Sequence, residues 1–539
     1  MGAMPSSRWT LYLSLFIVLL FASCAGSKKS CKQVPTLRLN MYHEPLTLDP
    51  RQGSEMVGSA MHFMLFEGLM RMNPDGSITP AQAKSIEISD DRLTYTFHLR
   101  GTQWSNGTAV TAADFEKAWK KILSPDFPAA NAHLLAPIKN AEKAKQGLVP
   151  IDEVGVHATN SQTLVVHLEH PTPYFLELIS FCVFFPVPHQ VDESEPHWME
   201  KTGPEFVCNG PFKLTIWKHQ NELVCEKNPL YWESSQINLN TIHINIVSNE
   251  ATVLNMYENG EIDMMGLGIC PIPNDVLARY YKQGLLKTYS SPGTTILSFN
   301  VEKFPFNNKN IRKAFAYAIH RHEIVDNVTL LGEDVATDLI PPCLRKSAPI
   351  VYFKDHDIEK ARELFQRGLK ELGITEDQFP TLTYYYSFSG VNHKLAQVLQ
   401  QQLLQKLEIQ IDLQQVEHKV LLDLLKSRNY ELAQSFWIAQ YNDPISILER
   451  FKYKTQAKNY PGWEHPEYIR LLEKSASDKT PEERLKTLQT AEALLLEEMP
   501  LVPLYHWKTG FMIQDHLNYQ DFPNNGFLEL TRISLKNEK

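Results

Sequence analysis

A helical pattern and a strand pattern alternate three times between residues 357 and 437. The first helical pattern ends at Gly373, and glycine is the residue type that most often follows a helix C-terminus. Strands that are joined through helices pair in parallel with right-handed crossovers. The sequence therefore predicts an open α/β sheet here. The predicted elements are helices over 357–372, 395–403 and 420–425 and strands over 381–388, 409–413 and 430–437.

The end of the last predicted strand marks a candidate binding position. Ligands of open α/β sheets bind beyond the carboxyl ends of the strands. The strand over 430–437 ends at Trp437. We therefore expect the segment that begins at Trp437 to lie at a binding site.

Several shorter segments carry the local signals of single elements. Residues 92–99 alternate apolar and polar side chains, as a half-buried strand does. Thr111 precedes a helical pattern over 112–123, and Asn308 precedes another one. Thr480 begins a third helical pattern, with a capping box and with proline at the first helical position.

The length and charge of the chain limit its organisation and its partners. With 539 residues the chain is too long for one hydrophobic core, so we expect two or three domains. The formal net charge is −9 and the isoelectric point is near 6.1. Proteins that bind nucleic acid normally carry a basic surface, so we expect no nucleic-acid partner.

The first 23 residues predict a signal peptide. Arg8 is their only charged residue, and an apolar run over 11–22 follows it. A run of about 12 residues is too short to span a bilayer but suits a signal-peptide core. The small residues directly before Cys24 resemble a bacterial lipobox, in which the cysteine is diacylated, although Phe21 departs from that pattern. We expect a lipid anchor on Cys24, and ordinary signal cleavage is the alternative.

Seven cysteines are present, and six remain if Cys24 is lipidated. Six cysteines allow fifteen pairings, and the sequence does not select one. Cys208 and Cys225 flank a predicted hairpin, whose turn near His219 would place Cys225 opposite Leu214 rather than opposite Cys208. Disulfides and buried free thiols both stay open.

The spacings of common catalytic and metal-binding motifs are missing. The sequence contains no P-loop, no HExxH, no GxSxG and no CxxC. The closest histidines, His320 and His322, are spaced i,i+2, and residues at that spacing do not share a helix face. We therefore expect a binding protein rather than an enzyme, with no catalytic residues, no metal and no cofactor.

Residues 81–115 resemble the signature of the peptide- and nickel-binding family of extracytoplasmic solute-binding proteins, which serve ABC importers. Further short blocks match that family along almost the whole mature chain. Each block is weak alone, and their shared order is what carries the resemblance. The blocks are residues 48–50, 65–69, 171–175, 209–212, 228–232, 259–263 and 305–307.

The resemblance implies an α/β, two-lobed, three-domain periplasmic-binding-protein fold with a hinge and an inter-lobe cleft. Closure of such lobes over a ligand produces a shape that the permease recognises. The implied divisions are a lipoprotein signal peptide at 1–23, lobe I from 25–66, 188–292 and 510–539, an appended domain at 67–187, and lobe II at 293–509.

By the same resemblance, residues 436–444 correspond to the stretch that holds the amino terminus of a peptide ligand. The family pattern has an aspartate that pairs with the ligand ammonium, and Gln440 replaces it here. A hydrogen bond to a charged partner contributes about 1.5–3 kcal/mol, against about 0.5–1.5 kcal/mol for a neutral one. The expected ligand-binding residues are Trp437, Gln440, Tyr441, Asn442 and Trp507, and Trp463 is evenly divided between cleft and core.

Other positions that the family resemblance implies to be charged are neutral here. Gln434, Thr329 and Asn392 stand where an arginine, a lysine and a histidine are implied, although a shift of one residue would restore the histidine at His393. Two interpretations stay open: the ligand differs, or a nearby carboxylate replaces the aspartate. The candidate carboxylates are Asp443, Glu44 and Glu55.

The resemblance predicts a monomeric, lipid-anchored binding protein on the periplasmic face of the bacterial cell membrane. It would capture short peptides and deliver them to an ABC permease in the inner membrane. The alternative on the same scaffold is a non-peptide or modified-peptide ligand, such as a cell-wall peptide, a glycan, a metal chelate or haem. A lipid-anchored enzyme and a surface adhesin or chaperone are hypotheses from other classes.

Overall fold

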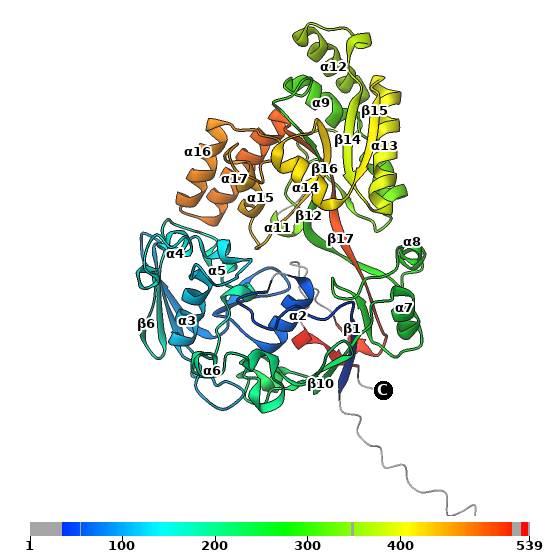
Figure 1. The fold of residues 1–539 in the computed structure, drawn as a ribbon. Helices are drawn as coiled ribbons and strands as arrows, with labels where there is room; N and C mark the ends of the chain where they lie inside the picture. The colour runs from blue at the N-terminus through cyan, green and yellow to red at the C-terminus, as the bar shows by residue number, and fades with distance from the viewer. Residues whose placement is uncertain (1–34, 54, 346–349, 520–529, 537–539) are drawn as a thin grey trace, which may run out of the picture.

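The computed structural model describes residues 35–53, 55–345, 350–519 and 530–536. An upper and a lower lobe lie one above the other, and two long strands run between them (Figure 1). These strands, β12 (Lys287–Phe299) and β17 (Leu501–Ile513), pair antiparallel along most of their length. The backbone hydrogen bonds of this ribbon therefore connect the two lobes.

The lower lobe contains two four-stranded sheets. In the first sheet the N-terminal strand pairs in parallel with a strand that follows it by some two hundred positions, so distant segments close this lobe. Its order is β1 (Thr36–Met41), β10 (Thr241–Ile246), β9 (Glu222–Lys227) and β8 (Phe212–Lys218).

The second sheet of the lower lobe is antiparallel and comes from one continuous stretch. Alternate side chains of β5 are buried, which confirms the half-buried strand predicted over 92–99. Its order is β4 (Ala83–Ile88), β5 (Thr94–Leu99), β7 (Thr163–His167) and β6 (Val156–Asn160).

The largest sheet spans both lobes in the order β11-β17-β12-β16-β14-β15, with β13 beside β17. In the upper lobe β14 pairs in parallel with both β15 and β16, and helices connect these strands. The predicted α/β alternation is thus confirmed. The elements are β11 (Met264–Gly266), β13 (Asp334–Val335), α12 (Ile358–Leu372), β14 (Leu382–Ser387), α13 (Gly390–Leu407), β15 (Ile411–Val416), α14 (His418–Ser427) and β16 (Leu432–Ile438).

One predicted strand boundary is wrong for a local reason. The strand expected over 409–413 begins at Ile411. Glu408 ends the preceding helix in the left-handed conformation with a φ of 57°, and the Ile409 amide still donates to the Leu403 carbonyl. The chain therefore leaves the helix over these two residues before it can enter the sheet.

The helix starts predicted after Thr111, Asn308 and Thr480 are confirmed, with one correction to the capping at Thr480. Thr111 and Asp114 form a capping box, and the side chain of Asn308 accepts from two backbone amides of the next helix. Thr480 accepts from the Glu483 amide, but the Glu483 carboxylate accepts from the Lys479 amide instead of completing the predicted capping box.

The other elements surround these sheets. They are α2 (Met56–Leu65), β2 (Met70–Met72), β3 (Ile78–Pro80), α3 (Ala112–Leu123), α4 (Ala141–Lys145), α5 (Phe175–Leu178), α6 (His189–Ser194), α7 (Glu250–Glu258), α8 (Asn274–Lys282), α9 (Lys309–Ala318), α10 (Arg321–Ile324), α11 (Pro342–Arg345), α15 (Ile445–Leu448), α16 (Pro466–Ser477), α17 (Pro481–Glu498), β18 (Leu517–Asn518) and β19 (Ser534–Leu535). Among the described residues, no helix has the length and apolar character needed to cross a membrane.

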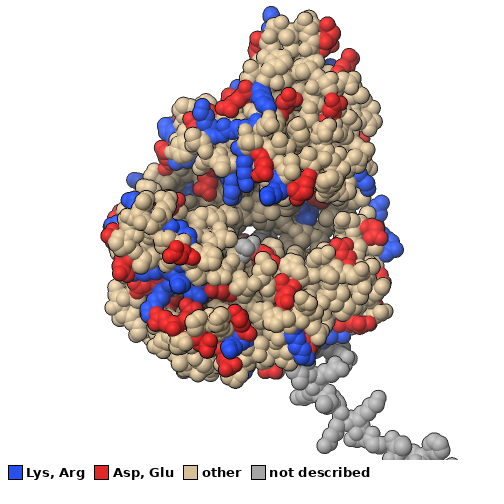
Figure 2. All heavy atoms as spheres, in the orientation of Figure 1, with Lys and Arg blue, Asp and Glu red and all other residues tan. Residues whose placement is uncertain are grey.

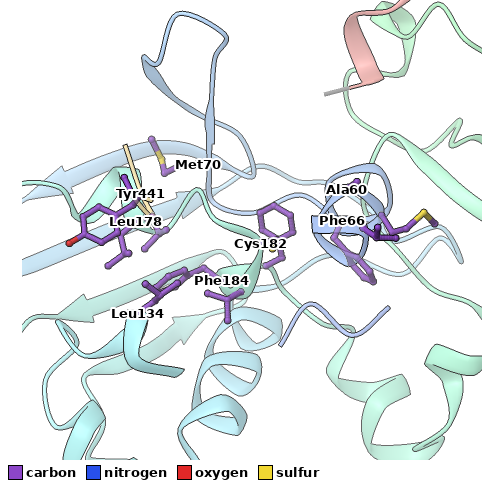
Figure 3. Close-up of a cluster of buried hydrophobic side chains, with 14 of the residues drawn as sticks. Ala60, Phe66, Met70, Leu134, Leu178, Cys182, Phe184 and Tyr441 are labelled. Atoms are coloured by element: carbon purple, nitrogen blue, oxygen red, sulfur yellow. The ribbon is translucent and has the colours of Figure 1, made fainter. Parts of the chain in front are cut away.

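Two clusters of buried apolar side chains form the core. One cluster lies in the upper lobe between the sheet and α9, α12 and α13. The other fills the lower lobe and continues into α15, α16 and α17 of the upper lobe. Figure 3 shows part of this second cluster, in which Tyr441 of the upper lobe joins lower-lobe side chains such as Met70 and Leu178.

The five cysteines within the described residues are free thiols. Leu214 is the partner of Cys225 across the β8–β9 hairpin, as the turn position predicts. Burial raises the pKa of Cys182 and of Cys208 to about 12, which keeps these thiols protonated and unreactive. Cys24 and Cys31 lie outside the described residues.

A buried ion cluster connects α11 and the residues before it to α17. The guanidinium of Arg345 lies 2.8 Å from Asp338 and 2.6 Å from Glu492, and all three side chains are at most 5% exposed. The Glu492 carboxylate also accepts from two backbone amides, those of residues 339 and 340. These contacts hold α11 against α17.

Arg345→Ala should destabilise the protein strongly, because it leaves two buried carboxylates without their cation. We expect the free energy of unfolding to fall by about 3–5 kcal/mol, measured by urea unfolding with tryptophan fluorescence. Arg470→Ala is the matched control, since Arg470 pairs with Glu467 at the surface and should matter little. Equal losses in the two variants would contradict this account of the cluster.

The cleft between the lobes

A hollow separates the two lobes on the surface of the molecule (Figure 2). The carboxyl end of β16 leads into it, and residues 439–442 line a cavity there together with residues of the lower lobe. The Ala439 amide donates to the Pro292 carbonyl at 2.8 Å, so this segment is attached to the connecting strand β12. The segment after β16, which the sequence predicts to lie at a binding site, therefore forms part of the wall of a cavity.

Gln440 lies half-buried on the edge of the cleft. Its Oε1 is 3.1 Å from Nε2 of His133 in the lower lobe, and its backbone amide donates to Ser446 Oγ at 2.9 Å. The side-chain nitrogen of an amide is a donor only, so it suits a carbonyl or carboxylate and cannot accept from an ammonium.

Tyr441 joins the two lobes through its ring. It stacks on Tyr174 of the lower lobe with ring centroids 4.8 Å apart and an interplanar angle of 8°. Its hydroxyl donates to Glu449 at 3.0 Å. Burial raises the pKa of both Tyr441 and Glu449. The Tyr441 hydroxyl therefore keeps its proton and remains the donor in this hydrogen bond.

Asn442 forms a further inter-lobe contact. Its Nδ2 donates to the carbonyl of Gly76 at 3.0 Å. The neighbouring Asp443 is bound by both terminal nitrogens of Arg484, at 2.6 and 2.9 Å, and it also accepts from the Ile445 amide. Its charge is therefore already compensated, which weighs against Asp443 as the replacement ammonium partner.

The other two candidate carboxylates are also occupied. Glu44 accepts from the Trp217 indole at 2.5 Å and contacts His219 at 2.6 Å. Glu55 accepts from the Leu46 amide at 2.6 Å. Neither of them lines the cavity beside Gln440.

The structure places Trp437 and its neighbour Phe436 on opposite faces of β16. Trp437 is 6% exposed and packs against Phe451 and Tyr460, with the guanidinium of Arg450 4.6 Å from its ring centroid. Successive strand residues point to opposite faces. Phe436 and Ile438 therefore share the other face, where each is more than two-fifths exposed.

Phe436 begins the predicted binding stretch 436–444 but was not named as a ligand-binding residue, although its place in the strand pattern over 430–437 puts it on the face opposite Trp437. The ring of Trp507 lies 5.1 Å from that of Phe436, and its indole donates to Thr295 at 2.7 Å. An added Cβ at Gly293 would approach both Trp507 and Ile438, so these side chains form one apolar surface. Trp463, by contrast, is 6% exposed and packs edge-on against Tyr468 in the core.

The three neutral residues that stand where the family resemblance implies charged ones lie in two different places in the structure. Gln434 donates to Asn392 at 2.8 Å, so these two side chains meet on the Phe436 face of β16. Thr329 lies apart from them and donates to Glu333 at 2.6 Å. His393 contacts the Tyr386 hydroxyl at 2.8 Å.

Comparison with known proteins identifies the family. Residues 77–459 match the bacterial extracellular solute-binding proteins, family 5. The oligopeptide-binding protein OppA of Bacillus subtilis is 35% identical over 96% of this chain and 98% of its own, and the dipeptide-binding protein DppE of the same species is 32% identical over 93% of each chain. The chain belongs to this family of substrate-binding transport proteins, whose members are two-lobed and extracytoplasmic.

Solved structures of relatives indicate how the lobes are arranged. The unliganded open form of the murein tripeptide-binding protein MppA superposes with a TM-score of 0.84, at 26% identity, covering 93% of this chain and 98% of its own. The complex of Haemophilus influenzae OppA with the peptide RPPGFSPFR gives 0.71, at 26% identity, covering 93% and 99%. At equal identity the open form fits better, so the lobes of this chain lie in an open-like arrangement.

Comparison of Gly76→Ala with Gly107→Ala tests the contact between Asn442 and Gly76 separately from the strain that alanine has at a positive φ. The φ angles are 79° and 86°, so alanine costs about 1–2 kcal/mol at either position. Only at Gly76 would the new Cβ lie 2.9 Å from Asn442 Nδ2, whereas Gly107 faces open space. We expect Gly76→Ala alone to increase the maximum dimension in small-angle X-ray scattering; parent-like profiles for both variants would contradict this role.

Proposed function

We propose that the protein captures short peptides in the inter-lobe cleft and closes its lobes over them. The observation that carries this proposal is that both lobes supply walls to one cleft, in a chain of a peptide-binding transport family. The relatives named above bind oligopeptides or dipeptides according to their names. Closure needs a ligand with higher affinity for the closed than for the open arrangement, and a ligand that touches both walls provides it.

The family setting supports the remaining parts of the proposal. The mature chain begins at Cys24, carries a lipid anchor there, and works as a monomer at the periplasmic face of the membrane beside an ABC permease. The divisions proposed for it are lobe I (25–66, 188–292 and 510–539), the appended domain (67–187) and lobe II (293–509). The sheets within the lower lobe and the ribbon of β12 and β17 are compatible with these divisions.

A second candidate is a ligand without a free ammonium group. It is favoured by the neutral side chain of Gln440 and by the ion pair that already occupies Asp443. A buried ammonium that faces an amide lacks charge compensation, which is costly. A blocked or modified peptide avoids this cost, and so does a non-peptide ligand.

Native mass spectrometry of protein purified without denaturation tests the two candidates. We expect adducts that correspond to a series of short peptides. If their amino groups are free, as judged by reaction with an amine-specific reagent, the second candidate is wrong. A single co-purifying mass of non-peptide composition would overturn the peptide proposal.

Gln440→Asp should strengthen the binding of tripeptides with a free amino group. The gain of a charged acceptor is worth about five- to tenfold in Kd, measured by calorimetry near pH 7. Gln410→Asp is the control, since Gln410 is exposed in the upper lobe and away from the cleft. The same affinity in all three proteins would mean that residue 440 does not face the ligand ammonium.

A further inference from the structure

The cavity beside Gln440 has mostly apolar walls. It occupies about 90 Å³ between the end of α2, strand β2 and helix α5 of the lower lobe and residues 439–442 of the upper lobe. The apolar side chains that line it include Phe63, Phe66, Met70, Phe181, Phe185 and Leu344.

Two charged groups of the lining, Glu67 and Arg71, have their charges compensated by each other and by neighbouring residues. The Glu67 carboxylate is 6% exposed and accepts from Tyr231 at 2.7 Å and from Trp232 at 2.6 Å. Arg71 is bound to Glu233 at 2.6 Å and lies 3.6 Å from Glu67. Neither residue offers an uncompensated charge to a ligand.

The remaining charged group of the lining is Glu177, which lies near the cation of Arg484 and stabilises its charge. Arg484 in turn binds Asp443. These charges belong to a network that connects the lobes at the edge of the cavity. The interior of the cavity is therefore a poor environment for an additional ion.

The upper wall of the cavity, residues 439–442 (the cavity roof), is held in place before any ligand binds. Residues 439–442 are tied to Pro292 of β12 and to three lower-lobe residues, His133, Tyr174 and Gly76. The cavity is therefore bounded by both lobes in the open-like arrangement. A group that enters it meets preformed walls, which lowers the entropic cost of binding.

We propose that this cavity receives one large apolar group of the captured ligand, an aromatic or branched aliphatic side chain. The inference rests on the proposed function, because the group must belong to a ligand of the cleft. The volume is within a factor of two of the roughly 150 Å³ cavity that binds benzene in an engineered protein. Met70 and Met72 are flexible and polarisable wall residues, so phenylalanine and leucine should both fit.

Calorimetry with ligand-free protein, refolded after removal of bound ligand in urea, tests the proposal on the unmodified chain. The probes are trialanine and tripeptides in which phenylalanine or glutamate replaces one alanine at each position in turn. We expect phenylalanine at one position to lower Kd by about 10- to 100-fold relative to trialanine. Glutamate at the same position should weaken binding.

Met72→Asp places a carboxylate in the cavity wall and should abolish the phenylalanine preference while trialanine still binds. The matched control is Met256→Asp, since Met256 is a partly buried methionine on α7 that does not line the cavity. Phenylalanine and alanine peptides that bind the parent protein equally would overturn this inference and leave peptide capture intact. Failure of every tripeptide to bind would overturn both.

Discussion

The antiparallel pairing of β12 with β17 is the constraint on which the two-lobed structure depends. Both strands run from one lobe into the other, so their ladder joins the lobes (Figure 1). The ladder is irregular between Ser290 and Thr294, where three residues of β12 stand opposite Trp507 alone. A bulge bends a strand and increases its local twist. The two-stranded ribbon is therefore least stiff at this bulge, which lies beside the cleft.

The bulge also positions the binding surface. Its Pro292 carbonyl holds the Ala439 amide, and its Gly293 leaves room for the ring of Trp507. A movement of one lobe relative to the other therefore displaces the cavity roof and the apolar surface around Phe436 together. Contacts such as the Tyr174–Tyr441 stack join the lobes a second time.

Much of the fold could be predicted because its signals are local. Helical and strand periodicity over 357–437, the cap at Asn308 and the turn of the β8–β9 hairpin are all properties of neighbouring residues. The segment 439–442 was expected at the binding site because ligand sites follow the carboxyl ends of parallel strands, and it lines the cleft.

The rest of the site could not be predicted because it depends on long-range contacts. Nothing near Gln440 in the sequence indicates His133, and nothing near Asp443 indicates that Arg484 already neutralises it. Trp437 was expected at the ligand because of the family resemblance, whereas strand alternation places its neighbour Phe436 on the face of Trp507. The apolar cavity combines α2, β2 and α5 with residues 439–442, and no sequence pattern joins these segments.

The central claim is that ligand binding closes the lobes around the cleft. Small-angle X-ray scattering of the ligand-free protein, with and without saturating amounts of the tightest-binding tripeptide, measures this directly. The account predicts that the radius of gyration and the maximum dimension both decrease when the peptide is added. Tight binding by calorimetry with an unchanged scattering profile would contradict it.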